Sequence, residues 1–361
     1  MEQKRIKLGV IGCWRGLDVI ESSLSNGKLY LRAICDFDRE KRDHAETVIR
    51  EKAPKGDELL LCETYEDLLA TDIDAVLVAN YAPEHVPFVI KALEAGKHVL
   101  SEIPAMFTVE QAKQLKAAVE AHPELTYMAA ENCCYWAFIR KYKELYDAGR
   151  LGDVVYAEAE YLHAGDLDRM APLDPNHWRT GLDAIRYITH ELGPLLYILN
   201  DKPVSVSCME SAFRYNPSKT GTELGAALIR TEKGSIIRIL INFGSYVGFD
   251  HNYRLFGTKG TVSTAYNVGI DRDPHSFGSF SDTPETRTNP IEIPVGCAMP
   301  GEDTSGHGGA EAKMMEDFLS CLLEHRKPDF DVDFAIAMTL PGVIGHESAL
   351  KGGANLEIPK I

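Results

Sequence analysis

A tyrosine and a histidine stand three residues apart in the segment YITHELGP, at Tyr187 and His190. The segment is helix-like, and residues at this spacing lie on one face of a helix, so both side chains can reach one substrate. Oxidation of an alcohol needs a base within hydrogen-bond reach of the hydroxyl proton. Histidine titrates nearest to neutrality, so His190 is the predicted catalytic base and Tyr187 its proton partner. The alternative is a His–Tyr pair packed at a domain interface.

The segment GVIGCWRGLD contains part of a dinucleotide-binding fingerprint. Such a fingerprint needs one glycine for a tight turn, a second for the approach of the pyrophosphate and a third for helix packing. Gly12 supplies the first, Trp14 occupies the place of the second, and Gly16 falls one residue early for the third. Asp36 ends the next strand-like run, where a carboxylate can bind the adenosine ribose and repel a 2′-phosphate. The pattern favours NAD over NADP, and the alternative for Asp36 is a simple strand-ending residue.

Strand-like and helix-like segments alternate through about residue 125. The runs IKLGVI, LYLRAICD, AVLVAN, HVLSE and TYMAAE are typical of parallel strands buried on both faces. Helix patterns separate them, one between Pro83 and Gly96 and another after a capping box of Thr108 and Gln111. Repeated strand, helix, strand units predict an α/β fold with a doubly wound parallel Rossmann sheet in residues 1–125.

The regular alternation of strand-like and helix-like segments does not continue in residues 126–361. After a helix-like segment at 135–148, the strand-like runs VVYAEAEYLH, VSVSCMES, ELGAALIRT, SIIRILINFG and NYRLFGTKGTVST follow, the last three separated by short turns. They predict an α+β domain with a largely antiparallel open sheet, which binds substrate. A sheet face that no helix covers needs a partner, so a homo-oligomer through this sheet is expected. Residues 271–309 are rich in Gly, Pro, Ser, Thr and Asp, and we expect a long loop.

The composition of the chain argues against some classes of binding partner. A chain of 361 residues has room for two domains, and its net charge of −16 argues against nucleic acid or an anionic membrane as partner. A small substrate, uncharged or cationic, fits better. The chain begins without a secretory pattern and has no apolar run of membrane-spanning length, so we expect a cytoplasmic protein. The eight cysteines, among them Cys13, Cys35 and Cys208, form no CxxC pair, and we expect reduced thiols and no metal site.

The chain resembles the Gfo/Idh/MocA oxidoreductase family. The resemblance rests on GVIGC, AICD, NYAPEHVPFVIKALEAGKHVLSEIP, the turn at Leu151 and Gly152, and HWRTG, which follow one another in family order. It implies a Rossmann domain, a C-terminal open sheet, bound NAD(P) and hydride transfer at a sugar or polyol hydroxyl. The residues it implies for cofactor binding are Gly12, Cys13, Trp14, Arg15, Asp36, Asn80, Pro83, His85, Glu102, Pro104 and Asn132. For His85, a place in the core is the alternative.

Two positions depart from the family pattern. The family's Glu-Lys-Pro is Glu102-Ile103-Pro104, and Arg186 stands where an aspartate is common, four residues before His190. Isoleucine can neither take a proton nor hold a hydroxyl. A narrower resemblance, carried by EIPA, ENCCY, YITHELGP and GHGG, is to the subset related to glycoside hydrolase family 109. That subset uses tightly held NAD to break glycosidic bonds.

The narrower resemblance implies a route that needs no lysine. Oxidation at carbon 3 of a sugar acidifies the proton on carbon 2, a base removes it, and the substituent on carbon 1 leaves before water adds and the hydride returns. Candidate substrate-binding residues are Tyr135, His163, Trp178, Arg179 and His307, each with a structural role as the alternative. Three functions stay open: net oxidation of a sugar hydroxyl, redox-neutral glycoside cleavage, and a catalytically silent nucleotide sensor.

Overall fold

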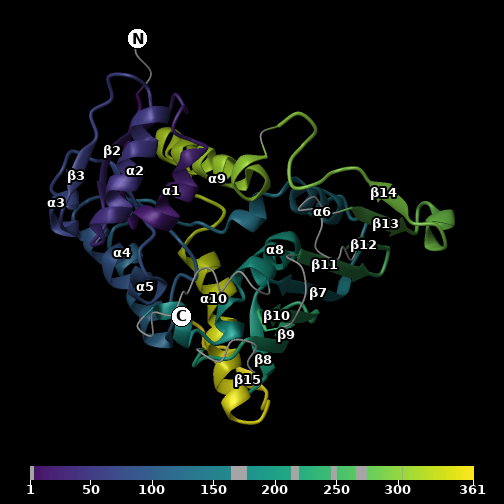
Figure 1. The fold of residues 1–361 in the computed structure, drawn as a ribbon. Helices are drawn as coiled ribbons and strands as arrows, with labels where there is room; N and C mark the ends of the chain where they lie inside the picture. The colour runs from purple at the N-terminus through teal and green to yellow at the C-terminus, as the bar shows by residue number, and fades with distance from the viewer. Residues whose placement is uncertain (1–3, 164–176, 213–218, 245–249, 266–274, 303) are drawn as a thin grey trace. The chain divides into compact units, whose positions relative to one another are not determined.

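The computed structural model of the chain describes residues 4–163, 177–212, 219–244, 250–265, 275–302 and 304–361 (Figure 1). It divides into two compact units, one made of residues 1–132, 305–336 and 361, the other of residues 133–304 and 337–360. A single boundary after residue 125 does not describe this division. The reason is helix α9 (Ser305–Glu324), which packs on α1 and β1 of the first unit.

The first unit is built on a parallel sheet of six strands in the order β3-β2-β1-β4-β5-β6. The strands are β1 (Ile6–Ile11), β2 (Leu29–Cys35), β3 (Leu60–Cys62), β4 (Ala75–Val78), β5 (His98–Ser101) and β6 (Tyr127–Ala129). This order is that of a doubly wound dinucleotide-binding sheet, so the predicted fold class of this unit is confirmed. Ligands of such sheets bind beyond the carboxyl ends of the strands.

Helices α1 (Cys13–Glu21), α2 (Arg39–Lys52), α3 (Tyr65–Leu69), α4 (His85–Glu94) and α5 (Val109–Ala121) alternate with these strands. The expected helix after Pro83 is α4, which follows the short 3-10 turn η1 (Ala82–Glu84). The side chain of Thr108 caps α5 by accepting a hydrogen bond from the backbone N–H of Gln111, which is one half of the expected capping box, while Gln111 Oε1 accepts from the backbone N–H of Phe107 at 2.7 Å. The carboxyl ends of β1 to β5 are therefore each followed by a loop that leads into a helix.

The second unit is built on a nine-stranded sheet in the order β14-β13-β12-β11-β7-β10-β9-β8-β15. The strands are β7 (Val154–Leu162), β8 (Pro203–Glu210), β9 (Leu224–Thr231), β10 (Ile236–Asn242), β11 (Asp250–Gly257), β12 (Gly260–Thr264), β13 (Ser276–Phe280), β14 (Ile291–Ile293) and β15 (Leu356–Glu357). Its pairs are antiparallel apart from β7 and β10, which run parallel. The predicted, largely antiparallel sheet is confirmed.

Helices lie on one face of this sheet. Helix α8 (Thr189–Leu199) packs on β7 and β11 and beside α6 (Ala137–Asp147), and α10 (Val332–Leu350) joins the unit from Ala337 onward. Along β9 the burial alternates, with Ala227 and Ile229 buried while Leu228 is 52% exposed. The second face of the sheet therefore presents apolar side chains to solvent.

The expected long loop at 271–309 is wrong where strands β13 and β14 interrupt it. Strands β13 and β14 extend the sheet beyond β12, with the 3-10 turn η5 (Pro284–Arg287) between them, and α9 begins at Ser305. Residues 271–274 and 303 lie outside the described residues. Strand β13 has the sequence SFGSF, in which Phe277 and Phe280 are three residues apart, so the period of two that indicates a strand is missing in a stretch of turn-forming composition.

Within the described ranges, no helix is both long and apolar enough to cross a membrane.

Candidate functional site

The loop between β1 and α1 depends on two glycines. Gly12 has φ +92°, and a Cβ atom on it would stand 2.3 Å from the carbonyl oxygen of Ala79, so only glycine fits. A Cβ atom on Gly16 would stand 2.5 Å from Cγ1 of Val10. Gly16 therefore gives the close helix–strand packing that the third fingerprint glycine normally provides, although it comes one residue early. Trp14, in the place of the second glycine, is 63% exposed.

Asp36 lies at the carboxyl end of β2 and is buried. Its Oδ2 accepts a hydrogen bond from the backbone N–H of Cys13 at 2.7 Å, and its Oδ1 accepts one from Asp38 at 2.8 Å. The carboxylate thereby joins the end of β2 to the first turn of α1. Each carboxylate oxygen has a second lone pair, so Asp36 retains the capacity to bind ribose hydroxyls.

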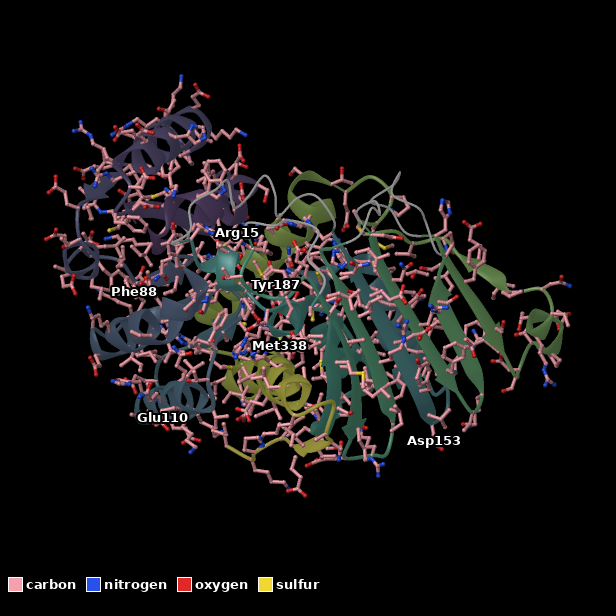
Figure 2. The ribbon with its side chains drawn as sticks, turned by 60° about the horizontal axis from the view of Figure 1, so that its bottom comes forward. Arg15, Phe88, Glu110, Asp153, Tyr187 and Met338 are labelled. Carbon is pink, nitrogen blue, oxygen red and sulfur yellow. The ribbon has the colours of Figure 1, made fainter. Side chains whose placement is uncertain are left out.

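Arg15 is held at the first turn of α1 by two acids of the first unit (Figure 2). Its Nε donates to Oε1 of Glu102 at 2.7 Å, and its guanidinium lies 3.4 Å from Oε1 of Glu311. Glu311 is fully buried and also accepts hydrogen bonds from Asn132 Nδ2 at 3.1 Å and from His307 Nδ1. Burial opposes its ionisation, but His307 and Arg15 outweigh burial and lower the pKa of Glu311 to about 2. The cluster joins three expected cofactor residues through an acid that sequence analysis missed.

His307 is placed by this cluster on α9, in the first unit. Gly306, His307, Gly308 and Gly309 all have positive φ, so the regular helix begins only after them. Because His307 lies before the regular part of α9, the helical spacing rule in the sequence does not link it to Glu311. The side chain of His307 remains 45% exposed, so it keeps a solvent-facing edge.

His85 joins the loops that follow β4 and β5. Its ring is buried, with Nδ1 3.0 Å from the carbonyl oxygen of Pro104 and Nε2 3.1 Å from that of Asn80. Burial lowers the pKa of His85, since the charged form loses its hydration. The geometry favours the alternative of a core histidine that shapes the pocket wall. The side-chain Oδ1 of Asn80 is buried with no hydrogen-bond partner among the described residues.

The loop after β5 contains the departure from the family pattern. The Glu102 Oε2 atom accepts a hydrogen bond from the backbone N–H of Ile103 at 2.9 Å, and the bond between Ile103 and Pro104 is cis. Ile103 is 6% exposed. An apolar side chain therefore occupies the place where the resemblance implies an ionisable one.

The predicted catalytic pair meets in the second unit. Tyr187 ends the 3-10 turn η4 (Ala184–Tyr187) and His190 lies in the first turn of α8, with ring centroids 5.2 Å apart (Figure 2). Tyr161 of β7 completes a cluster, because its ring lies 5.7 Å from both of theirs. Burial raises the pKa of Tyr161 above its usual value, so this hydroxyl stays protonated. The sequence analysis did not predict a role for Tyr161, because the run VVYAEAEYLH was interpreted only as a strand.

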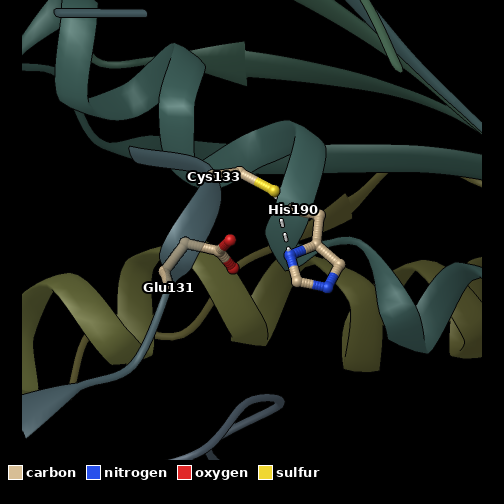
Figure 3. A group of neighbouring side chains, drawn as sticks. All are labelled: Glu131, Cys133 and His190. Carbon is tan, nitrogen blue, oxygen red and sulfur yellow. Dashed lines mark hydrogen bonds between the residues drawn. The ribbon is translucent and has the colours of Figure 1, made fainter. Parts of the chain in front are cut away.

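Tyr253 and Cys133 both contact His190. The Tyr253 hydroxyl of β11 donates a 2.7 Å hydrogen bond to the backbone carbonyl of His190, and Cys133 Sγ lies 3.3 Å from its Nδ1 (Figure 3). Cys133 belongs to the 3-10 turn η2 (Asn132–Tyr135). The predicted base is therefore held at its backbone and at one of its ring nitrogens.

A buried, hydrogen-bonded glutamate–histidine pair lies next to the predicted base. Glu191 is fully buried, and its Oε1 is 2.7 Å from Nδ1 of His251 on β11. The His251 ring packs 4.7 Å from that of Tyr161 and 4.9 Å from that of Trp136. Sequence analysis missed this pair because 60 residues separate its members.

Three of the expected substrate-binding residues join the cluster around Tyr187. The Arg179 guanidinium lies 4.6 Å from the Trp178 ring centroid and 5.2 Å from that of Tyr187, and the His163 ring lies 5.1 Å from that of Tyr161. Tyr135 is buried, with the Arg140 guanidinium 4.7 Å from its ring centroid. That stacking gives Tyr135 a packing role within the second unit.

A further group of polar side chains surrounds His346 of α10. Its Nδ1 is 2.7 Å from Oε2 of Glu210 and its Nε2 is 3.4 Å from Oδ2 of Asp183, to which Arg186 Nε also donates at 3.3 Å. The Thr222 hydroxyl donates to Glu210 at 2.9 Å. This set has the donor types of a metal site, but Arg186 already donates to Asp183 and Thr222 to Glu210. Arg186, which departs from the family pattern, thus forms an ion pair with Asp183.

Comparison with known proteins agrees with the geometry of both units. Residues 6–130 match the family model for an oxidoreductase family with an NAD-binding Rossmann fold, and residues 139–263 match the GFO/IDH/MocA C-terminal domain. A glycosyl hydrolase family 109 protein of Solibacter usitatus is 26% identical over 98% of this chain and 87% of its own length. One of the same name from Streptomyces filamentosus is 27% identical over 98% of this chain and 77% of its own.

Solved structures are similar over the whole chain. Levoglucosan dehydrogenase in complex with NADH and L-sorbose has a TM-score of 0.81 at 18% identity, covering 99% of this chain and 100% of that one. Scyllo-inositol dehydrogenase from Lactobacillus casei, with NAD(H) and scyllo-inositol bound, has a TM-score of 0.75 at 17% identity, covering 98% and 99%. At this identity the likeness shows the fold.

Proposed function

Because the chain belongs to the Gfo/Idh/MocA oxidoreductase family, we propose that this NAD-dependent enzyme oxidises a secondary hydroxyl of a sugar or sugar derivative. The observation that carries the proposal is the cluster of Tyr161, Tyr187 and His190, which brings three proton-carrying side chains from three elements together. Proton removal from a hydroxyl needs such groups, and His190 has the ordinary titration range closest to neutrality.

The cofactor is NAD, and the first unit has the features to hold it. Gly12 leaves room at the turn that a Cβ atom would fill, Asp36 stands at the end of β2 to bind ribose hydroxyls, and Asn80 has an unsatisfied buried oxygen. When bound, NAD supplies the hydride acceptor. We propose that Cys13, Trp14, Arg15, Pro83, His85, Glu102, Pro104 and Asn132 complete the pocket, His85 by shaping its wall.

The second unit supplies the proton chemistry. His190 takes the hydroxyl proton through its ring, and Tyr187 donates a hydrogen bond to the substrate oxygen or to the same base. Trp178 offers an apolar stacking face to a sugar ring, and Arg179 offers hydrogen-bond donors to its hydroxyls. His163 extends the polar wall of the cluster beside Tyr161. We propose that Tyr135 supports the second unit by packing against Arg140, and that His307 acts in the first unit through Glu311.

Redox-neutral glycoside cleavage is the second candidate, and two observations favour it. The full-length relatives in Solibacter usitatus and Streptomyces filamentosus carry the glycosyl hydrolase family 109 name, and Ile103 replaces the lysine of the wider family. Both candidates begin with the same oxidation and differ in whether the leaving group departs. A silent nucleotide sensor would need neither Tyr187 nor His190, whose proximity supports an enzyme.

The experiment that separates the candidates is a panel of nitrophenyl glycosides and free sugars with added NAD, monitored for nitrophenolate and NADH together. Accumulation of NADH on free sugars supports net oxidation. Release of nitrophenolate without NADH supports cleavage. If the whole panel gives neither signal while NAD binds normally, the enzymatic proposal fails.

We also propose a homo-oligomer through the open face of the second sheet. Leu228 is 52% exposed and pairs across the sheet with Arg238, whose guanidinium joins Glu158 at 2.8 Å. Met209 and Phe256 add exposed apolar side chains to the same face. Light scattering should give a dimer or larger for the wild type and a smaller species for Leu228→Glu. Leu350→Glu, at a 74% exposed position of α10, is the control that should leave the mass unchanged.

A reducing compartment such as the cytoplasm is our proposal for the location. Cys13, Cys35 and Cys208 are buried thiols, and burial raises the pKa of each to about 12, which keeps them protonated and unreactive. Thiol titration of the unfolded protein from its native cells should find all eight sulfhydryls, and a lower number would contradict the proposal.

A further inference from the structure

The 3-10 turn η4, which ends at Tyr187, is bonded at its start to distant parts of the second unit. The backbone N–H of Ala184 donates to the hydroxyl oxygen of Thr222 at 3.0 Å. The backbone N–H of Ile185 donates to Oε1 of Glu210 at 3.5 Å. The first N–H groups of a helical turn have no partner within the turn, so these two side chains take the place of a local cap.

A histidine of α10 holds Glu210 from its other oxygen. Nδ1 of His346 is 2.7 Å from Oε2 of Glu210, and the Thr222 hydroxyl donates to Oε1 at 2.9 Å. Burial opposes the ionisation of Glu210, but the hydrogen bonds from His346 and Thr222 outweigh it and hold the pKa of Glu210 below its ordinary value. A carboxylate accepts but cannot donate, so Nδ1 of His346 carries the proton of this bond. A chain of hydrogen bonds therefore runs from α10 through Glu210 and Thr222 to the first residue of η4.

The same turn packs directly on α10 and β9. A Cβ atom on Gly342 of α10 would stand 2.6 Å from the carbonyl oxygen of Ile185, and one on Gly225 of β9 would stand 2.9 Å from the Cβ atom of Ile185. Ile185 is fully buried between them. A single 3-10 turn has little stability of its own, so these tertiary contacts determine where η4 and Tyr187 lie.

Resting on the proposed role of Tyr187 in the reaction, we propose that His346 is a positioning residue, which holds Tyr187 in place through Glu210 and Thr222. His346 donates to Glu210, Glu210 orients the hydroxyl of Thr222, and Thr222 holds the start of η4. No proton leaves this chain of hydrogen bonds during turnover. Its task is to keep the Tyr187 hydroxyl where it can donate to the substrate oxygen or to the base.

The second ring nitrogen of His346 offers a competing route. Nε2 lies 3.4 Å from Oδ2 of Asp183, the residue before η4. This contact is longer than the 2.7 Å contact with Glu210, and the same oxygen of Asp183 accepts a hydrogen bond from Arg186 Nε at 3.3 Å. The geometry therefore favours Glu210 as the partner through which His346 acts. Two variants separate the routes, because asparagine can place its amide nitrogen where Nδ1 stands and glutamine where Nε2 stands.

The test follows the ¹³C signal of Tyr187 in protein labelled at tyrosine Cζ, with NAD bound and no substrate. The chain has 15 tyrosines, and Tyr187→Phe identifies the signal of Tyr187 by its absence. We expect His346→Leu, which removes both ring nitrogens, to displace this signal. His346→Asn should return it towards its wild-type position, and His346→Gln should leave it displaced. Thr222→Val, which replaces the linking hydroxyl by a methyl group, should displace it as well.

Turnover should follow the signal of Tyr187. With the substrate that the panel of nitrophenyl glycosides and free sugars identifies, we expect kcat of His346→Leu to fall about tenfold and KM to change little, since a catalytic group displaced by about 1 Å can cost about a hundredfold. His346→Asn should recover part of the loss. The Kd for NAD should stay as in the wild type, because the fingerprint loop lies in the first unit and His346 in the second.

Glu347→Gln is the matched control. Glu347 follows His346 on α10, and its side chain is 48% exposed and 3.9 Å from Lys351. The change should leave both the Tyr187 signal and kcat in place.

The two proposals fail in distinguishable ways. A Tyr187 signal that stays in place in both His346→Leu and Thr222→Val overturns the positioning role, whatever the activity. Where His346→Leu does not fold, Thr222→Val decides alone. Recovery by His346→Gln and not by His346→Asn overturns the route through Glu210. Normal turnover by Tyr187→Phe overturns the role of Tyr187 in the reaction, and with it that part of the proposed mechanism, even where its signal moves in the variants of His346.

Discussion

Glu191, the residue that follows His190, accepts a 2.7 Å hydrogen bond from Nδ1 of His251. The carboxylate is fully buried, and the histidine ring packs against Tyr161 of the proposed catalytic cluster. A buried charge without a partner is strongly destabilising, because it loses its hydration and gains nothing in return. The pair therefore couples the position of α8, which carries His190, to that of β11.

Removing His251 should destabilise the second unit. We expect His251→Ala to lower the free energy of unfolding by about 3 kcal/mol, since the buried carboxyl group of Glu191 loses this hydrogen bond and the ring of His251 no longer packs against Tyr161. Urea unfolding followed by circular dichroism measures the loss.

A double-mutant cycle isolates the pair from the packing of each side chain. Glu191→Gln with His251→Ala should be less harmful than the two single changes added together, by about 1 kcal/mol or more, because the hydrogen bond between the two side chains is lost only once. Additive effects would show that the pair contributes packing alone.

Asp36 should determine the choice between NAD and NADP. Replacing it with serine removes the negative charge that a 2′-phosphate would meet, and like charges in contact cost several kcal/mol. We expect the Kd for NADP to fall at least about tenfold in Asp36→Ser while the Kd for NAD rises, since Cys13 and Asp38 also lose their acceptor. Fluorescence titration with both nucleotides measures the ratio.

Asp38→Ser is the control for this change. Asp38 caps α2 through the backbone of Glu40 and bears the same charge two residues away. Serine preserves the cap, so the preference for NAD should stay as in the wild type. If Asp36→Ser and Asp38→Ser change the ratio of the two Kd values equally, the preference for NAD comes from the overall negative charge and not from the carboxylate at the end of β2.

The parts of the fold that local periodicity encodes were predictable from the sequence. Continuous apolar runs fixed the parallel sheet of the first unit, and short turns fixed the antiparallel pairs β9–β10 and β11–β12. Strand β13 was missed because Ser276, Gly278 and Ser279 are typical of a loop, and only pairing with β12 makes them a strand. Local pattern cannot reveal a strand that is stabilised by its neighbour.

The catalytic pair was predictable for the same reason, since Tyr187 and His190 are close in sequence. The contacts that hold Arg15 beside the nucleotide loop and those that hold His190 could not be predicted from the sequence. Glu311 reaches Arg15 across 296 residues, and Cys133 reaches His190 across 57. No spacing rule covers such distances, and these contacts follow only from the way α9 returns to the first unit and η2 meets α8.

Gly16 should behave as a packing glycine. Alanine at this position gains about 1 kcal/mol of helix propensity, but its Cβ atom would stand 2.5 Å from Cγ1 of buried Val10. Overpacking of this kind costs about 1–3 kcal/mol. We expect Gly16→Ala to lower the melting temperature and to weaken NAD binding, because α1 must move away from β1.

Shortening the facing side chain tests this explanation. The double variant Gly16→Ala with Val10→Ala removes the clashing Cγ1 atom and should bind NAD more tightly than Gly16→Ala alone. If the double variant binds no better, the defect lies in the loop conformation and not in the helix–strand contact.

Glu311 should make the first unit sensitive to acid. Its folded pKa of about 2 lies below the ordinary 4.5, so its contribution is complete above pH 4.5 and is lost as the pH falls towards 2. A shift of this size corresponds to about 3 kcal/mol at neutral pH. We expect Glu311→Gln to be less stable than the wild type by about that amount at pH 7, and the gap to shrink by about 1 kcal/mol between pH 5 and pH 3.5. Urea unfolding across this range measures the gap.

The same helix supplies the control. Glu316 of α9 pairs with Lys28, but its side chain is 44% exposed, so Glu316→Gln should cost less than about 1 kcal/mol at any of these pH values. If the difference in unfolding free energy between the wild type and Glu311→Gln stays constant with pH, the variant acts through lost packing. The charge of Glu311 then does not hold Arg15 and His307. A gap that narrows as the acid is protonated assigns the effect to the carboxylate, and through it to the position of Arg15 beside the loop that Gly12 begins.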